Sequence, residues 1–145
     1  MRNERNVELS RRWFAEVWNA NRLETVDELL APDVIIHGLG EDGDLVGSHH
    51  FKTFQKRFAE AFPDLHIAVN GVMSEGDETV VRLTFTGTHT GDGLGIPPTG
   101  RRVHVSALVW IVWRNGRMIE GWNEFDAAGM LKQLTAAPAA AKLRV

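Results

Sequence analysis

The strongest constraint on the fold is a change of hydrophobic period at Pro63. Before this residue, apolar side chains recur at helical spacing, and after it they alternate with polar ones. The alternating runs are LHIAVNGVM, TVVRLTFTGTH, RVHVSALVWIVW and RMIEGWNEF, with turn residues between them. Helices followed by an antiparallel meander pack on one face of a curved sheet. We therefore predict an α+β fold in which a curved antiparallel sheet wraps around three N-terminal helices, a cystatin-like cone with an internal pocket.

The first half of the chain supplies the helices, and one more helix follows the last strand. Four elements are expected before the meander: helices over 4–20 and 23–30, a strand over 33–38, and a helix that Ser48 caps and Pro63 ends. A short last helix is expected from Ala127 to Leu134. We predict a single domain over residues 1–134 and a flexible alanine-rich tail over 135–145.

Composition and charge narrow the class of protein. The 145 residues are 43% hydrophobic and 24% charged with a net charge of -3, which is typical of an ordinary globular domain. Because the chain has no basic stripe, we expect no nucleic-acid partner. No apolar run approaches the ~20 residues that cross a bilayer, and MRNERNVELSRRWF lacks the apolar core of a signal peptide. We expect no membrane association and a cytoplasmic location.

Five stretches of the sequence resemble the SnoaL-like polyketide cyclase family, which has the nuclear-transport-factor-2-like fold. They are APDVIIHG, AFPDLHI, EGDETVVRLTFTGTHTG, GIPPTGR and GWNEFDAAGMLKQL, in the family's order across most of residues 7–134. The resemblance implies an α+β cone, a polyketide-like small-molecule substrate, no metal and no organic cofactor. It also implies ring closure by intramolecular aldol condensation. The family includes hydroxylation-associated proteins, isomerases and cyclases acting on polyenes, so the resemblance defines the fold more closely than the reaction.

The catalytic aspartate that the resemblance implies is Asp126. The family's W-x-x-x-D motif falls on Trp122 and Asp126, so Asp126 is expected as the base and Trp122 beside the substrate. Asp126 also precedes AAGMLKQL, where its carboxylate would cap the last helix. Catalysis and capping both remain open for this residue.

His104 is the expected partner of Asp126, since an imidazole can give or take a proton near neutral pH. Whether the two side chains meet depends on the turn at Asn115-Gly116. A three-residue loop with a glycine bulge places His104 opposite Asp126, whereas a two-residue turn shifts the register by one. We favour the bulged loop, because it groups polar and aromatic side chains into one pocket wall. That wall would comprise His104, Ser106, Leu108, Trp110, Trp122, Glu124 and Asp126, with Trp110 and Glu124 binding substrate.

Two further histidines match positions of the family. His37 ends the DVIIHG strand, where the resemblance implies a side chain that faces the cavity, and His89 lies in GTHTG. Each would either orient the substrate or form structural hydrogen bonds. The long segment GTHTGDGLGIPPTGR, residues 87–101, is either a shaped connection or a lid over the mouth of the cone.

Other functions remain in competition with aldol closure. The same cone could close a ring pericyclically by folding a polyene, without a base, or could bind a small ligand without catalysis. A metal site is not expected, because the adjacent pair His49-His50 has diverging side chains. A sheet of this kind leaves one outer face, through which we expect a homodimer, with Trp113 as a candidate contact.

Overall fold

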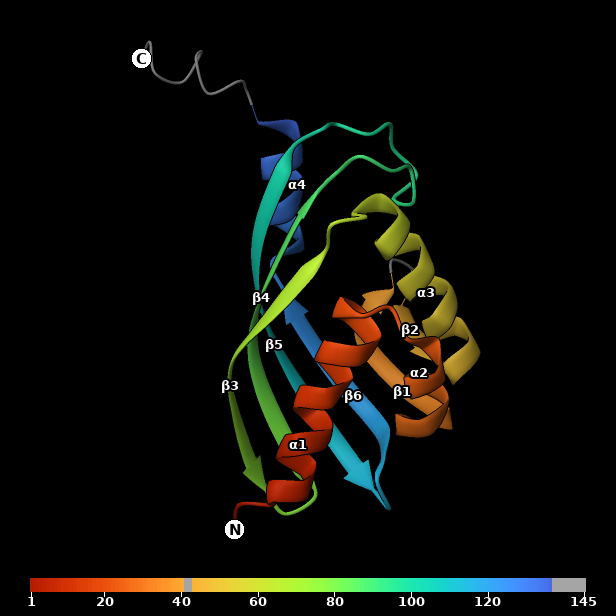
Figure 1. The fold of residues 1–145 in the computed structure, drawn as a ribbon, viewed down its shortest axis with the longest axis vertical. Helices are drawn as coiled ribbons and strands as arrows, with labels where there is room; N and C mark the ends of the chain where they lie inside the picture. The colour runs from red at the N-terminus through yellow and green to blue at the C-terminus, as the bar shows by residue number, and fades with distance from the viewer. Residues whose placement is uncertain (41–42, 137–145) are drawn as a thin grey trace.

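The computed structural model describes residues 1–40 and 43–136. Over these residues the elements follow in one order, α1 (Glu4–Arg12), η1 (Trp13–Asn19), α2 (Leu23–Leu29), β1 (Leu30–Gly40), β2 (Gly43–Val46), α3 (Ser48–Ala61), β3 (His66–Glu75), β4 (Glu78–Thr88), β5 (Arg102–Arg114), β6 (Arg117–Phe125) and α4 (Ala127–Thr135) (Figure 1). In this part of the chain, no helix is both long and apolar enough to cross a bilayer. Residues 137–145 of the predicted tail lie outside the described residues, Thr135 is the last residue of α4, and the single domain stays a prediction.

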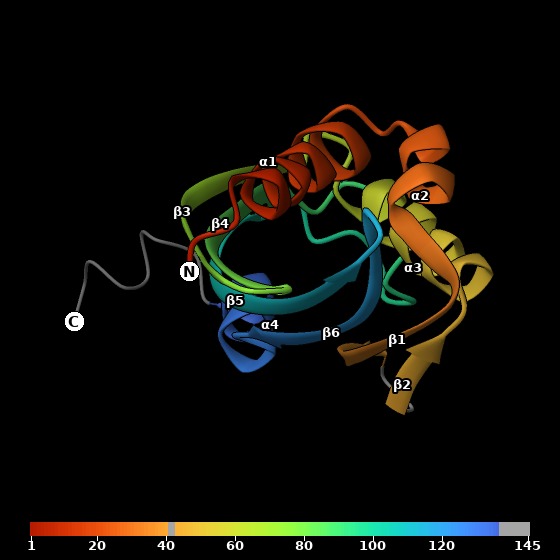
Figure 2. The same ribbon diagram turned by 90° about the horizontal axis from the view of Figure 1, so that it is seen from below.

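The strands form a six-stranded sheet in the order β2-β1-β6-β5-β4-β3. It curves around the side on which α1, η1, α2 and α3 lie, and α4 lies on the opposite, convex side (Figures 1 and 2). The predicted α+β class and curved sheet are confirmed. One neighbouring pair, β1 with β6, runs parallel, which the prediction of an antiparallel sheet did not include.

The first predicted helix, over 4–20, changes type part of the way along. It is an α-helix to Arg12 and a π-helix from Trp13 to Asn19. Trp13, Phe14 and Val17 of this segment are buried in the core. π-Helical turns are rare and occur often at functional sites, which directs attention to the space that this segment faces.

Glycine, and not serine, occupies the start of α3. Gly47 takes the capping position with φ +93°, a conformation that favours glycine, and the helix begins at Ser48 without a side-chain cap. The prediction that Ser48 caps this helix is therefore wrong. Strand β2 was not predicted, because its four residues carry no alternating apolar pattern.

The turn between β5 and β6 is the two-residue type. Asn115 and Gly116 both have positive φ, 52° and 77°, and Arg114 pairs with Arg117. Positive φ at both central residues is the signature of the type I′ turn that Asn-Gly favours. The predicted three-residue bulged loop is wrong.

An irregularity next to this turn restores the pairing parity. Trp113 pairs with Met118 and Val112 pairs with Glu120, so Ile119 is left over as an extra residue in β6. Such a bulge moves every later pair by one residue. The side chains that the predicted three-residue loop would have grouped therefore lie on one face of the sheet. They have different cross-strand partners from those predicted.

The long loop between β4 and β5 has a closed neck. The backbone N–H of His89 donates to Arg101 O at 2.8 Å, and Gly100 N–H donates to His89 O at the same distance. The backbone N–H groups of Thr90 and Gly91 both donate to Ala61 O at the end of α3. Figure 1 shows the loop reaching this end of the helix.

Two glycines let the loop lie directly on α3. A Cβ atom at Gly91 would stand 1.7 Å from the carbonyl oxygen of Glu60, and one at Gly93 would stand 1.8 Å from that of Arg57. No side chain fits such an approach of two backbones. The loop is therefore shaped by its contact with α3.

Candidate active site

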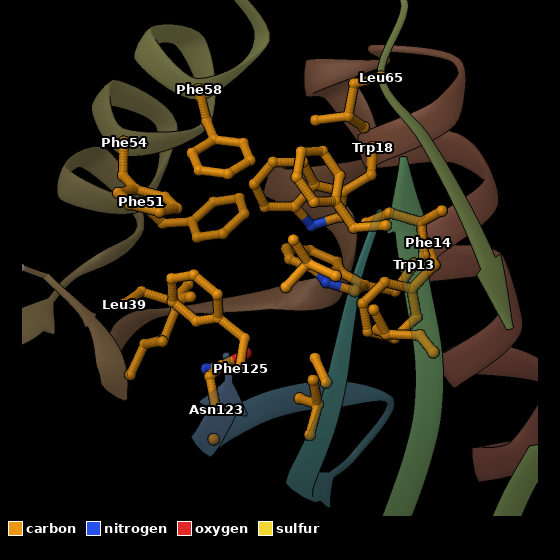
Figure 3. A pocket seen from close by; sticks show the side chains of 18 of the residues that line it. Trp13, Phe14, Trp18, Leu39, Phe51, Phe54, Phe58, Leu65, Asn123 and Phe125 are labelled. Atoms are coloured by element: carbon orange, nitrogen blue, oxygen red, sulfur yellow. The ribbon is translucent and has the colours of Figure 1, made fainter. Parts of the chain in front are cut away.

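An apolar cavity lies between the helices and the concave face of the sheet (Figure 3). Trp13, Phe14 and Trp18 enter it from η1. Phe51, Phe54 and Phe58 enter it from α3, on the opposite side of the cavity. Its volume is about 90 Å³, far below the roughly 300–1,000 Å³ of sites that enclose drug-sized ligands. Most of the cone is therefore filled by aromatic rings. We call this space the inner cavity.

Asn123 of β6 is the polar exception in the lining. Among the described residues that line the inner cavity, it alone carries an amide, hydroxyl, carboxyl or imidazole group. Its Nδ2 donates to the carbonyl oxygen of His37 at 3.1 Å, which leaves the Oδ1 atom as an acceptor. The strands approach closely here, because a Cβ at Gly38 (φ +86°) would stand 2.0 Å from Asn123 O.

A second, larger hollow adjoins the inner cavity. It has a volume of about 510 Å³ and lies between the β1–β2 hairpin, α3 and the loop that follows β4. Leu39, Phe54 and Phe58 line both spaces. The larger hollow also carries charged and polar side chains. We call it the outer cleft.

Most of the predicted site residues point away from both spaces. In β5 the inward side chains are Val105, Ala107 and Val109, and in β6 they are Asn123 and Phe125. Alternation then turns their neighbours to the convex face. The predicted pocket wall is wrong for this reason, since its members are exposed on that face: His104, Ser106, Leu108, Trp110, Trp122, Glu124 and Asp126.

His104 and Asp126 do not meet. The backbone N–H of Asp126 donates to Ser106 O at 3.3 Å, which places Asp126 beside Ser106. The Oδ1 atom of Asp126 accepts from Gly129 N–H at 2.8 Å, so the capping alternative is present. The backbone of His104 exchanges two hydrogen bonds with the side-chain amide of Gln133. The catalytic roles of the two residues stay a prediction that no contact between them supports.

His37 also faces outward, so the prediction that its side chain faces the cavity is wrong. Its Nε2 lies 2.7 Å from Glu120 Oε2, its Nδ1 lies 2.9 Å from Asp44 Oδ1, and its ring stacks on Trp122. The hydrogen bond to Glu120, followed by the one to Asp44, raises the pKa of His37. The carboxylates hold opposite ring nitrogens, so they do not converge as metal ligands would.

His89 is fully buried at the neck of the long loop, outside the lining of the inner cavity. Its Nδ1 accepts from the backbone N–H of Thr99 at 3.2 Å, which places the ring proton of the neutral form on Nε2. No partner for Nε2 lies among the described residues. The ring packs against Phe62. This geometry corresponds to the structural alternative for His89.

Sequence reasoning missed Asn123 and the outer cleft. The signal for Asn123 was present, because it alternates with Trp122 and Glu124 along GWNEF. Alternation separates the two faces of a strand, but it does not say which face is concave. The outer cleft depends on β2 and on the docking of the long loop, neither of which has a periodic pattern.

Comparison with known proteins agrees with this fold. The family model of the SnoaL-like polyketide cyclases matches residues 8–134. A candidate SnoaL-like polyketide cyclase from Jannaschia sp. CCS1 is 29% identical with a TM-score of 0.83, covering 93% of this chain and 94% of its own. IdmH, a candidate polyketide cyclase from Streptomyces antibioticus, is 31% identical with a TM-score of 0.77, covering 88% and 96%.

A third solved structure, AclR from Streptomyces galilaeus, is described as a candidate hydroxylase. It is 27% identical with a TM-score of 0.77, covering 93% of this chain and 98% of its own. A search of functionally curated proteins gave no match. The family model spans nearly all of the described residues, and the chain belongs to the SnoaL-like polyketide cyclase family.

Proposed function

We propose that this chain is a polyketide cyclase that closes a ring of its substrate in the inner cavity. The observation that carries the proposal is the lining of this cavity, which is aromatic and aliphatic around the amide of Asn123. Such a lining suits the apolar segment of the carbon chain in which the ring closes, and it excludes water. Family membership supports polyketide cyclisation in general, and the lining supports the place of the reaction.

The cavity would accelerate closure by holding two reacting carbons together. In a free flexible chain the two reacting carbons seldom meet, whereas a fixed folded conformation keeps them close together. Effective molarities for groups oriented in this way are very large. The Oδ1 atom of Asn123 would accept a hydrogen bond from a substrate hydroxyl. The indole N–H groups of Trp13 and Trp18 are donors that could meet a substrate carbonyl.

The same lining also supports one type of ring closure over the other. Aldol closure requires a base, and among the described residues that line the inner cavity none is titratable. Closure by folding of a polyene requires no proton acceptor. The geometry therefore favours pericyclic closure over an aldol reaction of Asp126 and His104, which lie on the other face.

Two variants separate these mechanisms in a cyclisation assay. Linear polyene and linear poly-β-keto thioesters would be incubated with the protein, and products identified by mass spectrometry as isomers or as products short of one water. Asn123→Leu should lower the rate at least about tenfold, the loss expected for one positioned hydrogen bond. Asp126→Asn should leave the rate within a factor of about two, because an amide still caps α4.

The opposite pattern would restore the aldol mechanism. A loss of several orders of magnitude in Asp126→Asn, with little effect of Asn123→Leu, would contradict our proposal. If no substrate in either class gives a product while ligands still bind, the chain would be a binding module.

We also propose that two copies of the chain pair through the convex face of the sheet. Apolar side chains are exposed there on four neighbouring strands: Val46, Ile35, Trp122, Trp110 and Leu108. We call these five residues the apolar strip, and exposed apolar side chains gathered on one face of a sheet favour association. The earlier candidate contact, Trp113, is wrong, because it is buried and its Nε1 donates to Thr79 Oγ1 at 3.0 Å.

A further inference from the structure

The inner cavity is too small to hold a polyketide chain by itself, whereas the outer cleft adjoins it and is several times larger. Leu39, Phe54 and Phe58 form the boundary between the two spaces, because they line both. A boundary made of side chains that can change rotamer allows a ligand to pass from one space to the other. The two hollows can therefore act as the two parts of one elongated site.

Helix α3 presents different chemistry to the two parts. Its phenylalanines Phe51, Phe54 and Phe58 line the inner cavity. His50, Thr53 and Arg57 lie one helical row away, at spacings of three and four residues, and line the outer cleft. The aromatic row and the polar row stand side by side on one helix. A ligand that lies along both would be apolar at one end and polar at the other.

Two side chains of the polar row, Arg57 and His50, retain groups that can form hydrogen bonds with a ligand. Arg57 Nε donates to Gly93 O of the long loop at 3.3 Å, which leaves both terminal amino groups of the guanidinium for a ligand. His50 uses Nδ1 in a 2.7 Å bond to Val46 O, which leaves Nε2. The loop therefore holds the guanidinium at the rim of the cleft through Nε and leaves the edge formed by the two terminal amino groups open to a carboxylate.

The charges around the cleft determine which polar end fits. Among the described residues that line the outer cleft, Arg57 is the arginine and Asp44 the acidic residue. The Oδ1 atom of Asp44 is already held by His37 Nδ1 at 2.9 Å. Arg57 has no carboxylate within salt-bridge distance among the described residues. The positive group is the one left to attract a ligand.

We propose that the substrate is an elongated molecule with an apolar segment and one carboxylate-type end, and that Arg57 binds this end in the outer cleft. This inference rests on the proposed role of the inner cavity, which would hold the apolar segment. A guanidinium matches the planar, two-oxygen geometry of a carboxylate and binds it through two parallel hydrogen bonds. Arg57 would thus set which end of the chain stays outside and which carbons enter the cavity.

A competition assay with simple amphiphiles tests the inference without the unidentified substrate. Nile red, which is neutral and apolar, would be bound to the protein and displaced by octanoate, octan-1-ol or octyltrimethylammonium. These compounds share one chain and differ in the end group. Octanoate should displace the dye at a roughly tenfold lower concentration than octan-1-ol, the size of effect expected for a charge-assisted hydrogen bond. The ammonium compound should be the weakest.

Variants of neighbouring residues of the same charge provide the controls. Arg57→Gln should make octanoate and octan-1-ol equally effective, and Arg57→Lys should keep part of the preference. Lys56→Gln removes a positive charge from the same helix outside the lining of the cleft, and it should keep the full preference. The wild-type comparison of end groups stands even if Arg57→Gln fails to fold.

The inference would be overturned if octanoate were no better than octan-1-ol with the wild-type protein, or if the preference survived Arg57→Gln. Because the assay involves no turnover, its result is independent of the cyclisation test. A protein that prefers octanoate but closes no ring would contradict the proposed function alone. A protein that closes rings without this preference would contradict the inference alone.

Discussion

His37 connects three strands through its two ring nitrogens. Glu120 of β6 and Asp44 of β2 each hold one nitrogen, so both nitrogens donate and the ring is favoured in its protonated form. The pKa of His37 is accordingly raised in the folded state. A raised folded-state pKa means that the ion pairs stabilise the fold fully below the unfolded-state pKa of about 6.5, and that this contribution is lost as pH rises through the folded-state value.

The variant His37→Gln tests this dependence. Urea unfolding of wild type and variant should differ by about 0.5–1 kcal/mol at acidic pH, the range for partly exposed ion pairs. The difference should shrink as pH rises above about 6.5 and passes through the raised folded-state pKa of His37, because the imidazole loses its proton. His104→Gln is the matched control, since its side chain has no carboxylate within salt-bridge distance among the described residues. A wild-type advantage that grows with rising pH would contradict the assignment.

Asn123 shows what single residues in the sequence can and cannot reveal. Its position next to Trp122 identifies the two faces of β6, and the grouping of Trp110 with Trp122 is correct. The sequence cannot say which face is concave, because both faces of β5 and β6 carry large apolar side chains. The choice between them depends on where the helices pack, which is a tertiary property.

The long loop and the end of α3 behave as one unit. Gly91 and Gly93 allow two backbones to touch, and the same contact positions Gly93 O as the acceptor for Arg57. The glycines in GTHTGDG are therefore explained by the neighbouring helix. A loop held in this way forms a fixed wall of the outer cleft.

Substituting these glycines should disrupt that wall. Gly91→Ala or Gly93→Ala would place a methyl group within 2 Å of a helix carbonyl oxygen, so the loop must move. We expect thermal denaturation to show a loss of more than about 1 kcal/mol for each variant. Gly71→Ala, which meets no atom within 4 Å, should be neutral to within about 0.5 kcal/mol. Equal stability of Gly91→Ala and Gly71→Ala would refute the docking contact.

The helices and long strands were predictable because each has a strong period. For example, RMIEGWNEF predicted the last strand of the meander, which is present as β6. The last helix was predicted to begin after Asp126 and is present as α4. The π-helical form of η1 was not predictable, since an α-helix would place the same aromatic residues on nearly the same side. The turn at Asn115-Gly116 was predictable from its type I′ preference, and the bulge at Ile119 was not.

At the scale of the whole molecule, the convex face of the sheet determines whether the protein is a monomer or a homodimer. Trp110 of the apolar strip is 49% exposed and pairs with Trp122 of the neighbouring strand. A stable homodimer typically covers about 800 Å² per partner, and a strip across several strands can supply it. Sedimentation should then give a particle of twice the 16.2 kDa chain mass.

Charge on this strip should separate the two copies. Trp110→Glu places a carboxylate in the proposed interface, and we expect sedimentation equilibrium to shift the wild-type dimer to monomer. Leu23→Glu introduces the same charge on α2, at a residue that is also partly exposed, and should leave the dimer intact. A wild-type monomer, or a Trp110→Glu dimer, would contradict the proposed pairing.

The position of a bound ligand tests the whole account most directly. Nuclear Overhauser contacts between bound octan-1-ol and the protein would report which face the carbon chain touches. We predict contacts from its methylene protons to the rings of Phe51 and Phe58 inside the cone. Contacts to the indoles of Trp110 and Trp122 instead would place the site on the convex face and contradict the account.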